Sequence, residues 1–160
     1  MSLVLGLILV APSKTIPEPH AALIESRATL IVCPSYDAKI HESWKSVIAK
    51  STTLKTCVIG DYEDMKKISY EQIRSEFDIV VFAFHIFETL QYFWLPKRKK
   101  RSYYNDAERD ELVISAREKL KSSGKLDATC PIIEHFYFHR IVIDGSHDIV
   151  KPQFGSRKYI

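Results

Sequence analysis

Short, unbroken apolar runs constrain the fold of this chain more than any other feature of its sequence. Residues 28–35, 78–84 and 139–147 each contain consecutive apolar residues and end in a turn or in polar residues. Runs of this kind are typical of parallel strands that are buried on both faces. They predict buried strands in each of these segments, the last one over Arg140 to Asp144, and residues 54–60 predict a further strand.

Helical spacing separates these strands. Ile40, Trp44, Val47 and Ile48 fall on one face of a helix over residues 36–50, and Ser35 is suited to cap its start. A short helix is expected over residues 70–76, and a longer one over 107–121 with a stop signal at Gly124. Strands that alternate with helices predict an α/β fold with a mostly parallel sheet.

The carboxyl ends of the predicted strands are the first place to look for a site. In open parallel sheets, ligands bind beyond these ends. The residues to examine are therefore Pro34–Ser35, Phe84–His85 and Asp144 to His147.

The same strand ends resemble a known family. TLIVCPS, followed by a helix that contains Trp44, resembles motif Ia of the Swi/Snf-type (superfamily-two) helicase-like ATPases. DIVVFAFHIFE resembles the next strand of that family, and FHRIVIDGSH resembles its Walker B segment, where RIVLDEAH is typical. A long insertion before this last segment is a feature of the branch linked to DNA repair and ubiquitin ligation.

The resemblance implies that residues 1–160 are an incomplete helicase ATP-binding domain, the first RecA-like (P-loop NTPase-type) lobe. It implies a parallel sheet with flanking helices and a helical, basic insertion at about residues 85–138. ATP and Mg²⁺ are the implied cofactors, and DNA and a second lobe or partner protein are the implied partners. Asp144 would hold Mg²⁺ through the nucleotide, His147 would couple the nucleotide site to neighbouring motifs, and Pro34 and Ser35 would contact nucleic acid.

Two departures from the family pattern predict that the chain is inactive. The phosphate-binding loop needs glycines where this sequence has Ile8 and Ser13, so Ser13-Lys14-Thr15 only imitates the end of that loop. Gly145 occupies the position of the glutamate that readies water for attack, so no catalytic residue is intact. We interpret the chain as a truncated, degenerate lobe without useful ATP hydrolysis, a gene-model truncation being the other explanation.

Five consecutive cations provide an alternative function. They are Lys97, Arg98, Lys99, Lys100 and Arg101, and two tyrosines follow them closely. This run matches a nuclear localisation signal, a nucleic-acid-binding patch or a solvated loop. The alternative is therefore a non-catalytic nuclear module that binds DNA or a partner protein through the basic insertion.

Cysteine and histidine spacing gives a weaker signal. Cys130, His135 and His139 have loosely zinc-like spacing, but the sequence offers no evident fourth ligand, so we favour a half-buried histidine pair without metal. Three widely spaced cysteines do not form a disulfide framework and suit a reducing compartment.

The apolar run at residues 3–11 is far shorter than the roughly 18–20 residues that span a bilayer, so no membrane segment is expected. Within the resemblance, it is the body of the helix that follows the phosphate-binding loop. A signal peptide is the alternative, although no positive side chain precedes the run. That alternative predicts a small secreted α/β protein.

Overall fold

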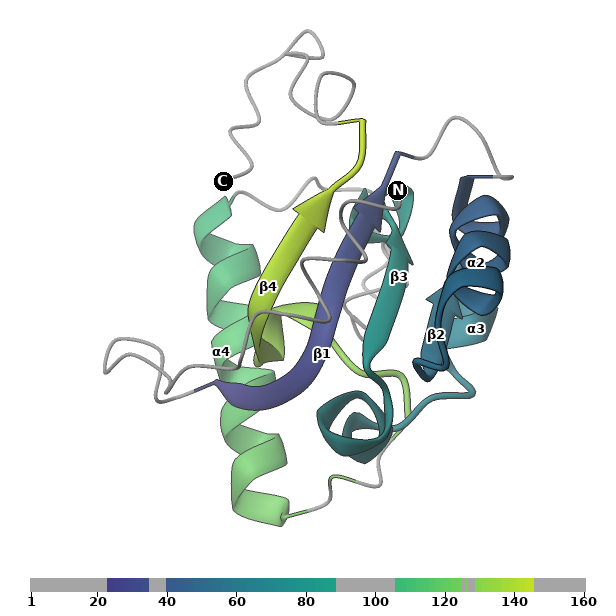
Figure 1. Ribbon diagram of the computed structural model, residues 1–160. Helices are drawn as coiled ribbons and strands as arrows, with labels where there is room; N and C mark the ends of the chain where they lie inside the picture. Colours follow the sequence, from purple (N-terminus) through teal and green to yellow (C-terminus); the bar gives the residue numbers. More distant parts are fainter. Residues whose placement is uncertain (1–22, 35–39, 89–105, 125, 127–128, 146–160) are drawn as a thin grey trace, which may run out of the picture.

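The computed structural model describes residues 23–34, 40–88, 106–124, 126 and 129–145. These residues form an α/β fold around a sheet of four strands in the order β2-β3-β1-β4, with every neighbouring pair parallel (Figure 1). The strands are β1 (Ile24–Cys33), β2 (Thr56–Ile59), β3 (Ile79–Ala83) and β4 (Phe136–Ile143). The α/β class and the parallel sheet expected from the sequence are confirmed.

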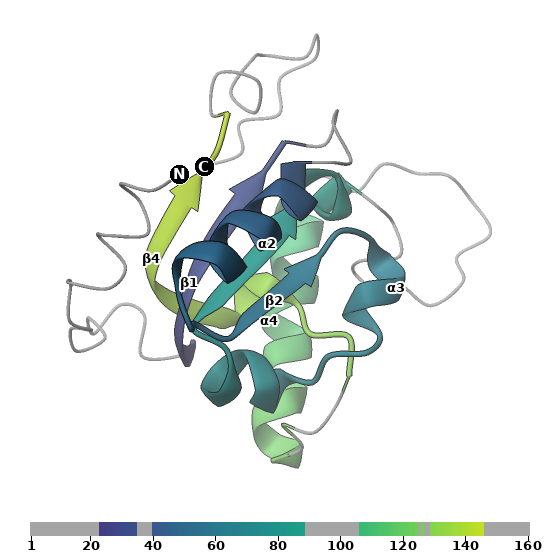
Figure 2. The same cartoon turned by 45° about the vertical axis from the view of Figure 1, so that its right-hand side comes forward.

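Helices flank both faces of this sheet. Helix α2 (Ile40–Ser51) lies on one face and α4 (Asp106–Ser123) on the other, as Figure 2 shows. Shorter elements complete the described chain: α3 (Tyr62–Met65), the π-helix η2 (Gln72–Glu76) and the 3₁₀ turns η3 (Phe84–Glu88) and η4 (Ile133–His135). The short helix expected over residues 70–76 is thus present, largely as a π-helix.

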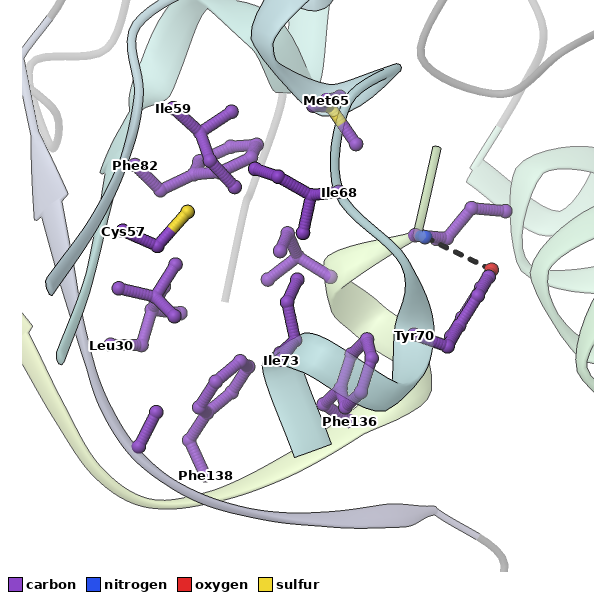
Figure 3. Close-up of a cluster of buried hydrophobic side chains, with 14 of the residues drawn as sticks. Leu30, Cys57, Ile59, Met65, Ile68, Tyr70, Ile73, Phe82, Phe136 and Phe138 are labelled. Atoms are coloured by element: carbon purple, nitrogen blue, oxygen red, sulfur yellow. Dashed lines mark hydrogen bonds between the residues drawn. The ribbon is translucent and has the colours of Figure 1, made fainter. Parts of the chain in front are cut away.

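The central strand β1 is buried on both faces because its side chains alternate between two apolar clusters. Leu30 and Val32 enter the larger cluster, which lies between the sheet and α3, η2 and α4 (Figure 3). Ile31 and Cys33 enter the smaller cluster, which lies under α2. The continuous apolar run in this segment therefore forms a strand buried on both faces, as predicted.

Helix α2 covers the smaller cluster with the face predicted from its sequence. Trp44 and Ile48 are buried there, and Ile40 and Val47 pack against them. The helix begins at Ile40 among the described residues, so the expected cap at Ser35 lies outside them.

Helix α4 also ends as expected. Gly124 follows its last residue and adopts a positive φ of 63°, a conformation that glycine adopts without steric cost. Leu120 is buried in the larger cluster, and Ile132, Ile133, Phe136 and Phe138 join it there. The described residues of the segment expected to be an insertion therefore contribute to the core, whereas residues 89–105 lie outside the described part.

Strand β4 differs from the prediction in its start, its end and its burial. It begins at Phe136 rather than Arg140 and ends at Ile143, so that Asp144 already belongs to a turn. Ile141 and Ile143 are 59% and 42% exposed, so the expectation of a strand buried throughout is wrong. The reason is topological: β4 is the edge strand of the described sheet, and β1 is its sole hydrogen-bonded neighbour there.

Candidate functional site

The carboxyl edge of the sheet brings together the ends of three strands that the sequence predicted. β1 pairs with β3 up to Cys33 and Ala83, and with β4 up to Val32 and Ile143. Pro34, Phe84 and Asp144 directly follow these strands, so the three predicted strand ends meet at one edge of the sheet.

This edge also contains a topological switch point. The chain continues from β1 into α2 over the smaller cluster, whereas it continues from β3 into η3, whose Ile86 is buried in the larger cluster. Neighbouring parallel strands whose continuations leave toward opposite faces mark the ligand-binding position of open α/β sheets. Pro34 is buried at this point, at the end of β1.

Asp144 is held at this edge by a contact that the sequence does not reveal. The Trp44 indole N–H donates a hydrogen bond of 2.8 Å to Asp144 Oδ2, and the Asp144 backbone N–H donates to the Val32 carbonyl at 2.9 Å. The indole itself is 2% exposed. One carboxylate oxygen is therefore already engaged by α2, and the side chain is fixed relative to the helix that follows β1.

The thiol of Cys33, at the end of β1, is unsuited to act as a nucleophile. Burial raises the pKa of Cys33 to about 12, and the negative charge of Asp144 adds to this shift. Because the thiolate is the reactive form, a thiol with this pKa stays protonated and inert near neutral pH.

The described residues at this edge do not fit a bound Mg²⁺–nucleotide pair. Among their carboxylates, Asp144 already accepts a hydrogen bond at one oxygen, and Asp61 and Asp64, which follow β2, already accept the backbone N–H groups of Asp64 and Gly60. Mg²⁺, by contrast, requires near-ideal octahedral oxygen coordination. No group of three His, Cys, Asp or Glu residues that could hold a metal occurs among the described residues. Gly145 follows Asp144 with a φ of 60°, a conformation that disfavours any residue with a side chain.

His85 is a further polar residue at this edge. Its Nδ1 atom is buried and has no hydrogen-bond partner, although the residue as a whole is partly exposed. It directly follows Phe84 at the end of β3, where the sequence had marked it for examination. The remaining predicted residues, Ser35, His147 and the basic run 97–101, lie outside the described residues.

The histidines with zinc-like spacing have separate partners. His135 is fully buried, and its Nδ1 atom lies 3.0 Å from the Tyr70 hydroxyl, which also accepts a hydrogen bond from the Ile132 N–H. His139 Nε2 lies 2.9 Å from Glu25 Oε1. Each histidine therefore has a partner of its own, as expected of satisfied side chains. Because His135 belongs to η4 and is fully buried, the expectation that the two are half-buried and share one face of a strand is wrong.

A surface cavity lies at the amino end of β1, where the sequence predicts no site. It encloses about 760 Å³, and its lining includes Ile24, Arg27, Arg74, Leu120 and Leu126. The arginines already have partners: Arg27 pairs with Asp78 at 2.9 Å, and Arg74 pairs with Glu71 at 3.3 Å. Since these residues come from β1, η2, α4 and the segment after α4, no local pattern in the sequence marks them as neighbours.

Comparisons with known proteins do not assign the chain to a family. Neither protein-family models nor curated proteins give a match. Among the residues that the structure describes, no helix combines the length and apolar character needed to cross a bilayer.

Proposed function

We propose that this chain is a RecA-like lobe of a Swi/Snf-type DNA-dependent ATPase that has lost ATP hydrolysis. The observation that carries the proposal is the hydrogen bond between Trp44 and Asp144, residues 100 positions apart in sequence. It joins the helix of the segment that resembles motif Ia to the aspartate of the segment that resembles Walker B. The third resembling segment forms β3, which pairs with β1 directly beside them.

The groups at this edge support the proposed loss of hydrolysis. Phosphoryl transfer depends on positioned charges and an oriented water, and the loss of one stabilising group costs several kcal/mol. Gly145 has no side chain to orient water, and Asp144 already accepts a hydrogen bond from Trp44. ATP and Mg²⁺, which the resemblance implies, therefore have no complete site in the described residues, and we propose that the lobe persists as a scaffold.

Single-turnover hydrolysis of labelled ATP, measured with duplex DNA and Mg²⁺, tests the loss of activity. We expect the chain to hydrolyse ATP no faster than its Asp144→Asn variant, while an intact Swi/Snf-type ATPase serves as the positive control. A Mg²⁺-dependent rate that approaches the positive control and disappears in Asp144→Asn would contradict the proposal.

A second candidate is the non-catalytic nuclear module that binds DNA or a partner protein. The connection between η3 and α4 favours it, because this connection leaves from the carboxyl edge after Glu88 and contains the five consecutive cations at 97–101. A basic run in this connection can add phosphate contacts to a lobe that no longer hydrolyses ATP.

Filter binding of duplex DNA across a salt series tests this second candidate. Each phosphate contact contributes a slope of about −0.9 to log K against log salt, so five contacts give about −4.5. A variant with all five cations changed to glutamine should lose most of this slope. The matched control changes Lys66 and Lys67, an exposed basic pair on the segment that follows α3, to glutamine. If wild type and the five-residue variant have the same salt dependence, the basic run does not bind DNA.

A further inference from the structure

We infer that the exposed edge of β4 is a self-association surface on which a second copy of this chain pairs antiparallel to the first. The surface consists of residues 140–144, which we call the β4 edge. The inference is independent of the proposed function, because it rests on the backbone direction, exposure and charge order of this one segment.

The backbone of the β4 edge is oriented to accept another strand. The Asp144 N–H donates to the Val32 carbonyl of β1. Successive residues of a strand direct their N–H and C=O groups to alternating sides, so Val142 also faces β1, whereas Ile141 and Ile143 direct these groups away from it. A row of outward-facing groups on an edge strand is a template for pairing with another chain.

The side chains of the same residues leave apolar surface uncovered. Ile141 and Ile143 lie opposite Leu30 and Val32 in the register of β1 and β4, so all four belong to the face of the larger cluster. Yet Leu30 and Val32 are at most 7% exposed, whereas Ile141 and Ile143 are 59% and 42% exposed. Among the described residues, the apolar face of the sheet thus continues to its edge without cover, and a second strand would bury it.

The order of charges selects a copy of the same segment as the partner. When two copies pair antiparallel about a two-fold axis at Val142, Ile141 of each lies opposite Ile143 of the other, and Arg140 lies opposite Asp144. Residues that lie directly opposite each other in such a pair have side chains on the same face. Arg140 and Asp144 meet this condition, because both point to the face that α2 covers. Arg140 Nε donates to Thr29 Oγ1 at 3.1 Å, and Asp144 accepts from Trp44 of α2. The segment is therefore complementary to itself in backbone, apolar contacts and charge.

The geometry predicts a weak dimer. Ile141 and Ile143 would exchange N–H···O=C bonds at both ends of the axis, but five residues per copy bury less than the roughly 1,200 Å² of a stable interface. We expect a dissociation constant between about 10 and 1,000 μM. In such a dimer the carboxyl edges of the two sheets face opposite directions.

Disulfide trapping of the full-length chain tests the register. In the Val142→Cys variant the two new thiols lie across a non-hydrogen-bonded pair with Cα atoms about 4.5 Å apart, within the range of a disulfide. We expect rapid cross-linking of this variant under mild oxidation. In the Ile141→Cys variant alone, the new cysteines of the two copies are offset by two residues and should not cross-link. A mixture of Ile141→Cys and Ile143→Cys chains places the two cysteines opposite each other and should cross-link. The wild-type chain, with its three native cysteines, is the background control.

Sedimentation equilibrium of the wild-type chain and an Ile143→Pro variant provides the second measurement. Proline removes an N–H that faces away from β1, a position where edge strands tolerate it, and should weaken dimerisation at least about tenfold without unfolding the chain. A wild-type chain that stays monomeric up to about 1 mM, or a Val142→Cys variant that cross-links no faster than wild type, overturns the inference. Slow amide exchange at Ile141 and Ile143 in a monomer would also overturn it, since another segment of the same chain would then cover the edge.

Discussion

The hydrogen bond between Trp44 and Asp144 can be measured as a coupling free energy. Phenylalanine in place of Trp44 keeps an aromatic ring in the smaller cluster but removes the N–H donor that lies 2.8 Å from Asp144 Oδ2. A hydrogen bond to a charged group contributes about 1.5–3 kcal/mol, and because Asp144 is only half-buried we expect the lower end, about 1.5 kcal/mol.

A double-mutant cycle separates this bond from the packing of the indole. The cycle compares wild type, Trp44→Phe, Asp144→Ala and the double variant by urea unfolding followed by far-UV circular dichroism. With a slope of about 1–3 kcal/mol per molar urea, a coupling of 1.5 kcal/mol corresponds to about 0.5–1.5 M in the midpoint. Lost packing appears equally in both backgrounds and cancels, so a coupling below about 0.5 kcal/mol would refute the contact.

Three further predictions concern the stability of the fold. Tyr70→Phe removes the hydroxyl that accepts the Ile132 N–H in a buried site, so the free energy of unfolding should fall by about 1–3 kcal/mol in urea titrations. Gly124→Ala meets no atom within 4 Å but must adopt a φ of 63°, so it should cost about 1 kcal/mol, seen as a lower Tm in calorimetry. Burial raises the pKa of Cys33 and of Cys57 from 9.0 to about 12, so the folded state holds these protons more tightly than the unfolded state. Stability should be fully present below pH 9 and decline toward pH 12, and an unfolding midpoint that stays constant across this range would contradict the assignment.

Much of the fold was predictable because local patterns determine it. The unbroken run around Ile31 indicates a strand covered on both faces, the spacing of Trp44 and Ile48 indicates one buried helix face, and Gly124 marks a helix end. Each of these signals depends on residues that lie within a few positions of one another.

The edge position of β4 was not predictable in the same way. Residues 140–144 have the same continuous apolar pattern as the central strands, but burial requires a neighbour on each side, and among the described strands β4 has one. Its start was missed because Phe136 and Phe138 indicate core packing without specifying a strand.

The candidate site was only partly predictable. The rule that parallel strands place their carboxyl ends together correctly brought Pro34, Phe84 and Asp144 to one edge. The Trp44–Asp144 contact spans 100 positions, and a tryptophan at helical spacing indicates packing rather than a donor. Contacts at that separation depend on the finished topology and leave no local pattern.

The unequal cover of the two sheet faces has a consequence for motion. Among the described elements, α2 alone covers the smaller cluster, whereas α3, η2 and α4 share the other face. Local opening of a domain begins where a segment has few buried contacts, so we expect α2 to detach before the strands separate. Detachment of α2 would break the hydrogen bond from Trp44 to Asp144. The carboxyl edge of the sheet would then alternate between a state with this bond and a state without it.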